Sequence, residues 1–226
     1  MSNKIDQPDQ TDTNQGIQPA AIETTKTNPE IENGSSAIRN ALEEATSPEM
    51  MLERFNQILA ELGFTRKYNK LPASREEYAP LEGKSVLIVD DSMSVITEFI
   101  PELLIATGGN ANFVHHQEQT TNDLIEDEFE RVLNTIIAEN PDIVLMDLML
   151  ANNIRGTEVV RQLRAYGFDT TKIIGFSSLS GKDIIEQFQN AGALYATSKD
   201  PWGSTADSVT RVAHVVKNTN KIKANM

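Results

Sequence analysis

From Lys84 onward, short apolar runs alternate with stretches whose apolar residues recur at helical spacing, and this alternation constrains the fold more than any other feature. It is typical of a parallel sheet in which helices connect successive strands. Most of the runs are continuously apolar, as expected for strands that are covered on both faces. The five runs are residues 86–89, 113–114, 143–146, 173–176 and 193–196. We therefore predict an α/β domain with a five-stranded parallel sheet and helices on both faces.

The apolar stripes between these runs predict the connecting helices. The first helix, over residues 93–106, contains Pro101 well inside it, which predicts a kink or an early end there. The remaining stripes lie at residues 129–137, 159–163, 184–188 and 209–216.

The segment before the sheet has a different composition. Residues 1–34 are polar, poor in aromatic residues and without periodicity, which predicts a disordered tail. Residues 35–64 form a predicted helical extension, in which Ser47-Pro48 can start a helix whose apolar stripe runs from Met51 to Leu62. That stripe either packs on the main domain or offers a docking or dimer surface. The remaining boundaries that we predict are a linker at 65–83, the main domain at 84–218 and a C-terminal tail at 219–226.

Composition excludes several classes of function. The chain has 33 acidic and 20 basic residues, and the resulting charge of -13 disfavours binding to nucleic acid. It has no cysteine, which excludes disulfides, thiolate metal sites and cysteine nucleophiles, and its three histidines give little support to an all-imidazole metal site. Without an apolar run of about 18 residues, we expect no membrane span and a cytoplasmic protein.

Polar residues follow four of the five predicted strands at the point where each run ends. Asp90 and Asp91 follow the first run, Asp147 the third, Ser177 the fourth and Lys199 the fifth. Each alone has an ordinary structural interpretation as a helix cap, a turn residue or a solvated charge. The carboxyl ends of parallel strands meet at one edge of a sheet, where ligands bind. Together, these five residues therefore predict a functional site.

The residue types at this edge indicate phosphoryl chemistry. Three carboxylates repel one another unless a cation neutralises them, and oxygen ligands without histidine or cysteine select Mg²⁺. Asp147 can attack phosphorus as a nucleophile and form an aspartyl phosphate. Asp90 and Asp91 can hold the metal ion, while Lys199 and the Ser177 hydroxyl contact the phosphoryl oxygens.

The order and spacing of these motifs resemble the receiver domain of two-component response regulators (CheY-like). The resemblance covers residues 84–218 and implies a flavodoxin-like sheet of strand order 2-1-3-4-5. It further implies a stand-alone receiver with an N-terminal extension. The segments that carry it are SVLIVDDS at 85–92, PDIVLMDLML at 141–150, IIGFSS at 173–178 and AGALYATSK at 191–199.

The resemblance assigns a role to each site residue. Asp147 is implied to be the phosphoacceptor and, with Asp90, Asp91 and the backbone carbonyl of Met149, a ligand of Mg²⁺. Ser177 is the implied switch hydroxyl, and Lys199 contacts the phosphate. A partner surface on the last strand and helix is expected to include Tyr195 and Trp202.

Three departures from the family pattern affect regulation. The loop 151–155 is altered, because Gly156 comes one residue later than usual. Asp200 separates Lys199 from the proline that usually follows it directly, so a cis peptide is in question there. The usual aromatic switch position holds Ala196, and its neighbour Tyr195 faces the opposite way in a strand.

We predict a single-domain response regulator. Its phosphodonor is a histidine kinase or a histidine phosphotransfer protein, since residues 1–80 contain no histidine of their own. Its output is phosphorylation-dependent binding to a downstream protein, with a homodimer through the N-terminal helices as a further interaction. It is not expected to be an enzyme beyond its own phosphorylation and dephosphorylation.

Two other functions stay open. One is a pseudo-receiver that binds a partner without being phosphorylated. The other is a Mg²⁺-dependent phosphohydrolase, although the Asp-Asp-Ser motif ends the wrong strand for that nucleophile.

Overall fold

The computed structural model describes residues 47–61, 64–65, 67–70, 75–199 and 204–223. The predicted tail at 1–34, Trp202 and the peptide bond before Pro201 lie outside these residues.

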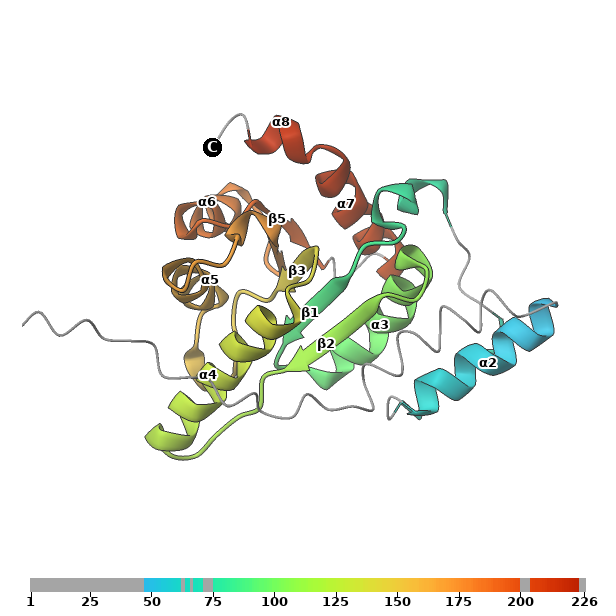
Figure 1. Ribbon diagram of the computed structural model, residues 1–226, viewed down its shortest axis with the longest axis horizontal. Helices are drawn as coiled ribbons and strands as arrows, with labels where there is room; N and C mark the ends of the chain where they lie inside the picture. The colour runs from blue at the N-terminus through green and yellow to red at the C-terminus, as the bar shows by residue number, and fades with distance from the viewer. Residues whose placement is uncertain (1–46, 62–63, 66, 71–74, 200–203, 224–226) are drawn as a thin grey trace, which may run out of the picture.

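A five-stranded parallel sheet forms the centre of the molecule (Figure 1). Its order is β2-β1-β3-β4-β5, and each neighbouring pair is parallel. This confirms the predicted flavodoxin-like order 2-1-3-4-5. The strands are β1 (Val86–Asp90), β2 (Ala111–His115), β3 (Ile143–Met146), β4 (Ile173–Ser177) and β5 (Tyr195–Ser198).

Helices cover both faces of the sheet, as predicted. One face packs on α3 (Met93–Thr107) and α7 (Thr205–Lys217), and the other on α4 (Asn122–Glu139), α5 (Gly156–Ala165) and α6 (Lys182–Ala191) (Figure 1). Successive residues of β1 point into opposite cores: Ile88 contributes to the α3 side and Val89 to the α4 side. Short elements complete the described chain: 3₁₀ helices η1 (Glu76–Leu81), η2 (Ala151–Asn153) and η3 (Thr170–Lys172), and α8 (Thr219–Lys223).

Helix α3 does not end at its proline. It continues through Pro101 to Thr107, so the predicted early end is wrong. Proline lacks one backbone N–H and therefore removes one helical hydrogen bond. The turns on either side are nevertheless held by apolar residues that are almost completely buried against the sheet, including Ile100 and Leu103.

Part of the segment predicted as a linker is built into the core. Within η1, Tyr78 and Leu81 are buried, and the Tyr78 hydroxyl donates a hydrogen bond to Glu102 Oε1 in α3 at 2.5 Å. The linker interpretation is corrected for residues 76–81, because these side chains fill a gap beside α3 and α7. Residues 219–223, predicted as tail, form α8.

A helix precedes the sheet, as the sequence predicts. Helix α2 (Pro48–Glu61) buries Phe55 and Leu59 almost completely in the core cluster on the α3 side. Phe64, just after the helix, lies 5.9 Å from the ring centre of Phe113 in β2. At these positions the apolar stripe packs on its own domain. Among the described helices, none combines the length and apolar character that crossing a membrane requires.

Candidate functional site

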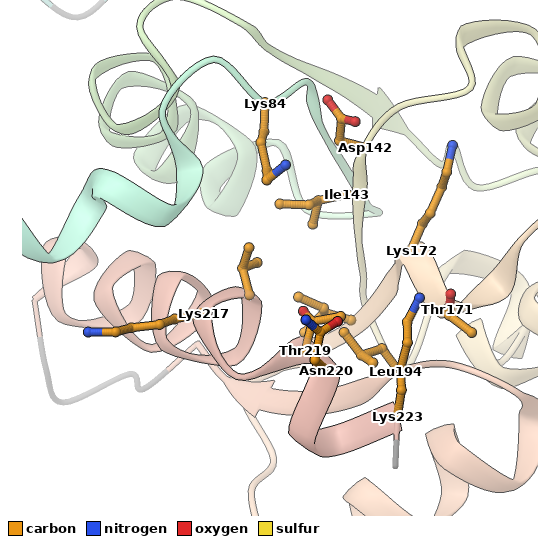
Figure 2. Close-up of a pocket in the computed structure, with 12 residues that line it drawn as sticks. Lys84, Asp142, Ile143, Thr171, Lys172, Leu194, Lys217, Thr219, Asn220 and Lys223 are labelled. Atoms are coloured by element: carbon orange, nitrogen blue, oxygen red, sulfur yellow. The ribbon is translucent and has the colours of Figure 1, made fainter.

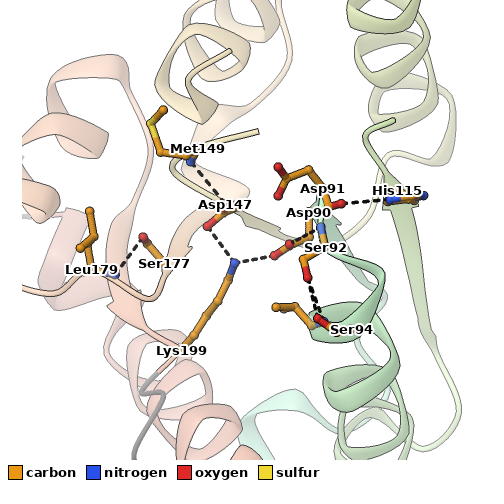
Figure 3. Close-up of polar contacts among 11 residues, drawn as sticks. Asp90, Asp91, Ser92, Ser94, His115, Asp147, Met149, Ser177, Leu179 and Lys199 are labelled. Carbon is orange, nitrogen blue, oxygen red and sulfur yellow. Dashed lines mark hydrogen bonds and ion pairs between the residues drawn. The ribbon is translucent and has the colours of Figure 1, made fainter. Parts of the chain in front are cut away.

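Charged side chains from three strands meet at the carboxyl edge of the sheet (Figure 3). Asp90 ends β1, Asp147 directly follows β3, and Lys199 directly follows β5. The Lys199 ammonium lies 2.5 Å from Asp90 Oδ2 and 2.7 Å from Asp147 Oδ1. All three side chains are largely buried, with 1% of Asp90, 6% of Lys199 and 11% of Asp147 exposed. The lysine therefore neutralises two carboxylates that would otherwise repel each other.

Asp91 supplies a third carboxylate beside this pair. One oxygen from each of Asp90, Asp91 and Asp147 lies within 4.8 Å of the others, and Asp91 is the most exposed of the three. The His115 ring donates a hydrogen bond from Nε2 to the main-chain oxygen of Asp91 at 3.0 Å (Figure 3). An all-oxygen set of this size suits a hard divalent cation such as Mg²⁺.

The strand-to-helix turn fixes Asp90. Its Oδ1 accepts a hydrogen bond from the main-chain N–H of Ser92 at 2.9 Å. Ser92 in turn is the N-cap of α3, where its hydroxyl accepts from the Val95 N–H at 3.5 Å. Such a cap satisfies a free N–H of the first turn. Ser92 thus caps the start of α3 with its hydroxyl and orients Asp90 with its main-chain N–H.

Asp147 is held by the turn that follows β3. The main-chain N–H of Met149 donates to Asp147 Oδ2 at 3.3 Å, and the Met149 side chain is 41% exposed. The main-chain oxygen of Asp147 occupies the space where any Cβ of Gly156 would lie. Only glycine fits without a shift of the backbone at the proposed phosphoacceptor.

The loop after Asp147 has an unusual backbone. Asn152 and Asn153 both adopt left-handed conformations, with φ of 60° and 59°. Asparagine tolerates this region better than most residues. The Asn152 amide also forms two hydrogen bonds with the main chain of Gln119, at 2.6 and 2.9 Å. These bonds tie the loop to the segment that follows β2, a contact that the sequence did not predict.

Ser177 stands at the end of β4, beside Lys199 (Figure 3). Its hydroxyl is buried and accepts a hydrogen bond from the Leu179 N–H at 3.2 Å. In the described part of the chain, this hydroxyl forms no hydrogen bond with Asp147 or with the Lys199 ammonium. The structure therefore brings Asp90, Asp91, Asp147 and Lys199 into direct proximity and places Ser177 at their margin.

The backbone of Lys199 has partners that sequence reasoning missed. Its N–H donates to the Ser177 oxygen at 2.8 Å, and its oxygen accepts from the Ser208 hydroxyl at 2.6 Å. Arg211 donates to the same hydroxyl at 2.9 Å. Helix α7 therefore supports the residue that reaches the carboxylates. A buried serine on an otherwise apolar helix stripe was the only signal for this contact.

Burial sets the protonation behaviour of the proposed phosphoacceptor. Removal from water raises the pKa of Asp147 above its usual value, although the neighbouring Lys199 ammonium works in the opposite direction. The carboxyl group of Asp147 is therefore harder to ionise than a carboxyl group in water. A further cation at this site would favour the charged, nucleophilic form.

Directly after β2, His116 places another buried polar side chain near the site. The His116 side chain is 1% exposed, and its two ring nitrogens have no hydrogen-bond partner among the described residues. Burial lowers its pKa, which keeps the ring neutral. Next to it, Arg131 bonds to Glu128 at 2.6 Å and to the His115 oxygen at 2.7 Å. The Arg131 guanidinium thus connects α4 to β2, whose last residue, His115, contacts the main-chain oxygen of Asp91.

Ala196, at the usual aromatic switch position, and its neighbour Tyr195 face opposite cores. Ala196 is buried on the α6 side of the sheet, whereas Tyr195 is half-buried against the α3 and α7 side. This agrees with the alternation predicted for a strand. The Ala196 side chain carries no ring that could follow a movement of Ser177.

Comparisons with known proteins find similarity at the level of solved structures. No protein family model matches the chain, and no curated protein matches it. The signal receiver domain of the response regulator NarL from Mycobacterium tuberculosis is 20% identical, with a TM-score of 0.43, over 60% of this chain and 98% of that domain.

Two further receiver domains are similar to the same degree. The BeF₃-activated receiver domain of RstA from Klebsiella pneumoniae is 22% identical, with a TM-score of 0.43, over 59% of this chain and 98% of that one. The receiver domain of the histidine kinase CKI1 from Arabidopsis thaliana, complexed with Mg²⁺ and BeF₃⁻, is 19% identical. Its TM-score is 0.42, and the match covers 64% of this chain and 95% of that one.

Proposed function

We propose that residues 84–218 form a receiver domain that accepts a phosphoryl group on Asp147. The observation that carries this proposal is the convergence of Asp90, Asp91 and Asp147 with the Lys199 ammonium at the carboxyl edge of the sheet. This set combines a nucleophile, an oxygen-rich place for a divalent cation and a fixed positive charge. Those are the components that phosphoryl transfer to a carboxylate requires.

The donor in this proposal is a phosphohistidine of a histidine kinase or a histidine phosphotransfer protein. A carboxylate oxygen of Asp147 attacks the phosphorus, a P–O bond forms, and the P–N bond breaks with its electron pair returning to the imidazole ring. Asp90, Asp91, Asp147 and the main-chain carbonyl of Met149 would hold Mg²⁺, which would supply positive charge to the phosphoryl oxygens. Lys199 exchanges its contact with Asp147 for a phosphoryl oxygen, and the Ser177 hydroxyl donates to another.

The signal to a downstream protein follows from these new contacts of Lys199 and Ser177 with the phosphoryl group. When the Ser177 side chain turns toward a phosphoryl oxygen, it gives up the hydrogen bond that it accepts from the Leu179 N–H. The loop between β4 and α6 then rearranges, and this changes the surface that a downstream protein contacts. Leu179 is 59% exposed in the present structure, and Tyr195 lies on the next strand. The domain thereby signals by binding, without turnover of an external substrate.

One observation favours a second candidate, the pseudo-receiver. Lys199 forms ion pairs with both Asp90 and Asp147, so a charge of the protein itself compensates the two carboxylates. A domain that keeps both ion pairs binds its partner independently of phosphate. A homodimer through α2 has less support, because Phe55 and Leu59 are buried in their own domain.

Incubation with Mg²⁺ and a small phosphodonor tests the proposal and separates it from its alternatives. The receiver predicts a covalent, acid-stable and base-labile phosphoryl adduct, which is absent from Asp147→Asn. A complete lack of adduct from both small donors and histidine kinases supports the pseudo-receiver. Continuous hydrolysis of a phosphate ester indicates the phosphohydrolase. Asp183→Asn, the same substitution at an exposed aspartate of α6, keeps every site carboxylate and the lysine and serves as the control.

A further inference from the structure

A pocket of about 280 Å³ lies at the end of the sheet opposite to the carboxylate site. It is lined by the first residues of β3 and β4, by Leu194 just before β5, and by the segment from α7 to α8 (Figure 2). Its wall contains Ile143 and Leu194, which are at most 4% exposed. The pocket is thus open to solvent, and the apolar part of its inner surface is formed by Ile143, Ile174, Leu194 and Val216.

Lysines dominate the charge of this pocket, in a chain whose overall charge is -13. Lys84 and Lys223 direct their ammonium groups toward its interior, whereas Lys217 points away from it (Figure 2). Lys172 extends along the rim, where its ammonium donates to Asn140 Oδ1 at 2.8 Å. Within the described residues, neither Lys84 nor Lys223 forms an ion pair with a carboxylate.

The acidic residue of the lining does not cancel this charge. Asp142 Oδ2 accepts hydrogen bonds from the N–H and the hydroxyl of Ser85, at 2.9 and 3.0 Å. Its carboxylate is turned away from the interior in Figure 2. Two ammonium groups, which come from segments about 140 residues apart in sequence, therefore face the pocket without an ion pair to any described residue. The carboxylates of Asp142 and Asp169 attract Lys84 and Lys223, respectively, without contact.

We propose that this pocket binds a small phosphate monoester with an apolar body. The phosphate takes the space between Lys84 and Lys223, where each ammonium donates a charge-assisted hydrogen bond to it. The Asn220 amide lies on the same lining and offers a further donor. The apolar body rests on Ile143 and Leu194, which supply apolar surface beside the polar groups of the lining. This site is separate from Asp147 and does not depend on the proposed function.

Phenyl phosphate is a suitable probe, because it carries a phosphate dianion on one small ring. Titration of the ¹⁵N-labelled full-length protein is expected to shift the amide resonances of Lys84, Ile143, Leu194 and Lys223 in a saturable manner. Lys84→Gln and Lys223→Gln should each weaken binding by roughly tenfold. Lys182→Gln is the matched control, since Lys182 lies on α6, is 86% exposed and pairs with Glu186.

Two further ligands test the two parts of the proposal. Phenol lacks the phosphate and inorganic phosphate lacks the ring, so each should bind more weakly than phenyl phosphate. Equal shifts with phenol would contradict the anionic site, and equal affinity for inorganic phosphate would contradict the apolar contact. Absence of saturable shifts, or equal affinity in the lysine variants, overturns the proposal. Asp147→Asn should bind the probe as the wild type does, which separates this test from that of the phosphoacceptor.

Discussion

Gly156 lies so close to Asp147 that the main-chain oxygen of the aspartate fills the place that a Cβ atom at position 156 would take. A substitution at Gly156 must therefore move the turn that carries the proposed phosphoacceptor. We expect Gly156→Ala to lower the free energy of unfolding by about 1–3 kcal/mol, the usual cost of forcing extra atoms into a packed site. It should also weaken Mg²⁺ binding and slow phosphorylation, which calorimetry and adduct formation would measure.

Gly83→Ala is the matched control for this substitution. Gly83 has open space around its Cβ position but a φ of +69°. Its replacement should cost stability through backbone strain, while Mg²⁺ binding stays unchanged. Equal Mg²⁺ affinity in wild type and Gly156→Ala would show that the turn does not set the position of Asp147.

Lys199 is the only cation bonded to Asp90 and Asp147 within the described chain, so its removal leaves two buried carboxylates without compensation. We expect Lys199→Met to lose about 3–5 kcal/mol of stability at neutral pH in the presence of a chelator. Saturating Mg²⁺ should recover part of this loss, because it stabilises the folded state that binds it. Urea unfolding with and without Mg²⁺ measures both effects.

For the lysine prediction, Lys182→Met provides the comparison, because the exposed ion pair of Lys182 contributes little to stability. A Lys199→Met protein as stable as the wild type in chelator would show that Lys199 and the carboxylates are not in contact in solution.

Glu128 should contribute to the loss of stability in acid. Burial by itself raises its pKa, but hydrogen bonds from Arg131 and from the Gln117 N–H outweigh this and hold the pKa below its usual value. Folding therefore favours the ionised form. The contribution is present above the unfolded pKa and is lost as the pH falls through the lowered folded value.

Glu128→Gln tests this pH dependence. The variant should be less stable than the wild type near neutral pH, and the difference should shrink as the pH falls below the unfolded pKa and through the lowered folded one. Because the Glu128 carboxylate also interacts with the His116 ring, the comparison reports the two groups together. A difference in stability that stays constant with pH would contradict the assignment.

Helix α2 is expected to stabilise the domain through Phe55, which is 1% exposed. Phe55→Ala should cost about 3–5 kcal/mol, because it leaves a cavity against the core cluster on the α3 side. Met50→Ala on the same helix, at a side chain that is 50% exposed, should cost far less. Equal, small losses of unfolding free energy in both variants would mean that α2 does not pack on its own domain. Such a result would support a dimer surface on α2 instead.

The position of the site could be predicted from the sequence because it follows from topology. Asp90, Asp147 and Lys199 each end an apolar run, and parallel strands bring such ends to one edge. The contacts that hold these residues could not be predicted in the same way. Ser208 supports the Lys199 oxygen from α7, and Gln119 meets Asn152 across 33 residues. The serine on an apolar helix stripe was the only sequence signal for the first pair, and the second pair had none.

The errors in the fold prediction have a similar cause. Tyr78 is buried because α7 covers it, and its hydroxyl contacts the Ala206 oxygen 128 residues away. The prolines and charged residues near Tyr78 predicted a linker, because they reflect only the local sequence and not the contact with α7. Strand β5 begins at Tyr195, two residues later than its apolar run, because the Ala193 N–H bonds to Phe188 and closes α6. Hydrophobicity alone does not distinguish a helix end from a strand start.

Calorimetric titration with Mg²⁺ tests the central claim most directly, because the account requires Asp90, Asp91 and Asp147 to share one ion. The wild type should bind one Mg²⁺ per chain. Asp91→Asn removes the most exposed ligand charge and should weaken binding by at least roughly tenfold. Absence of Mg²⁺ binding by the folded wild type, or equal affinity in Asp91→Asn, would contradict the account.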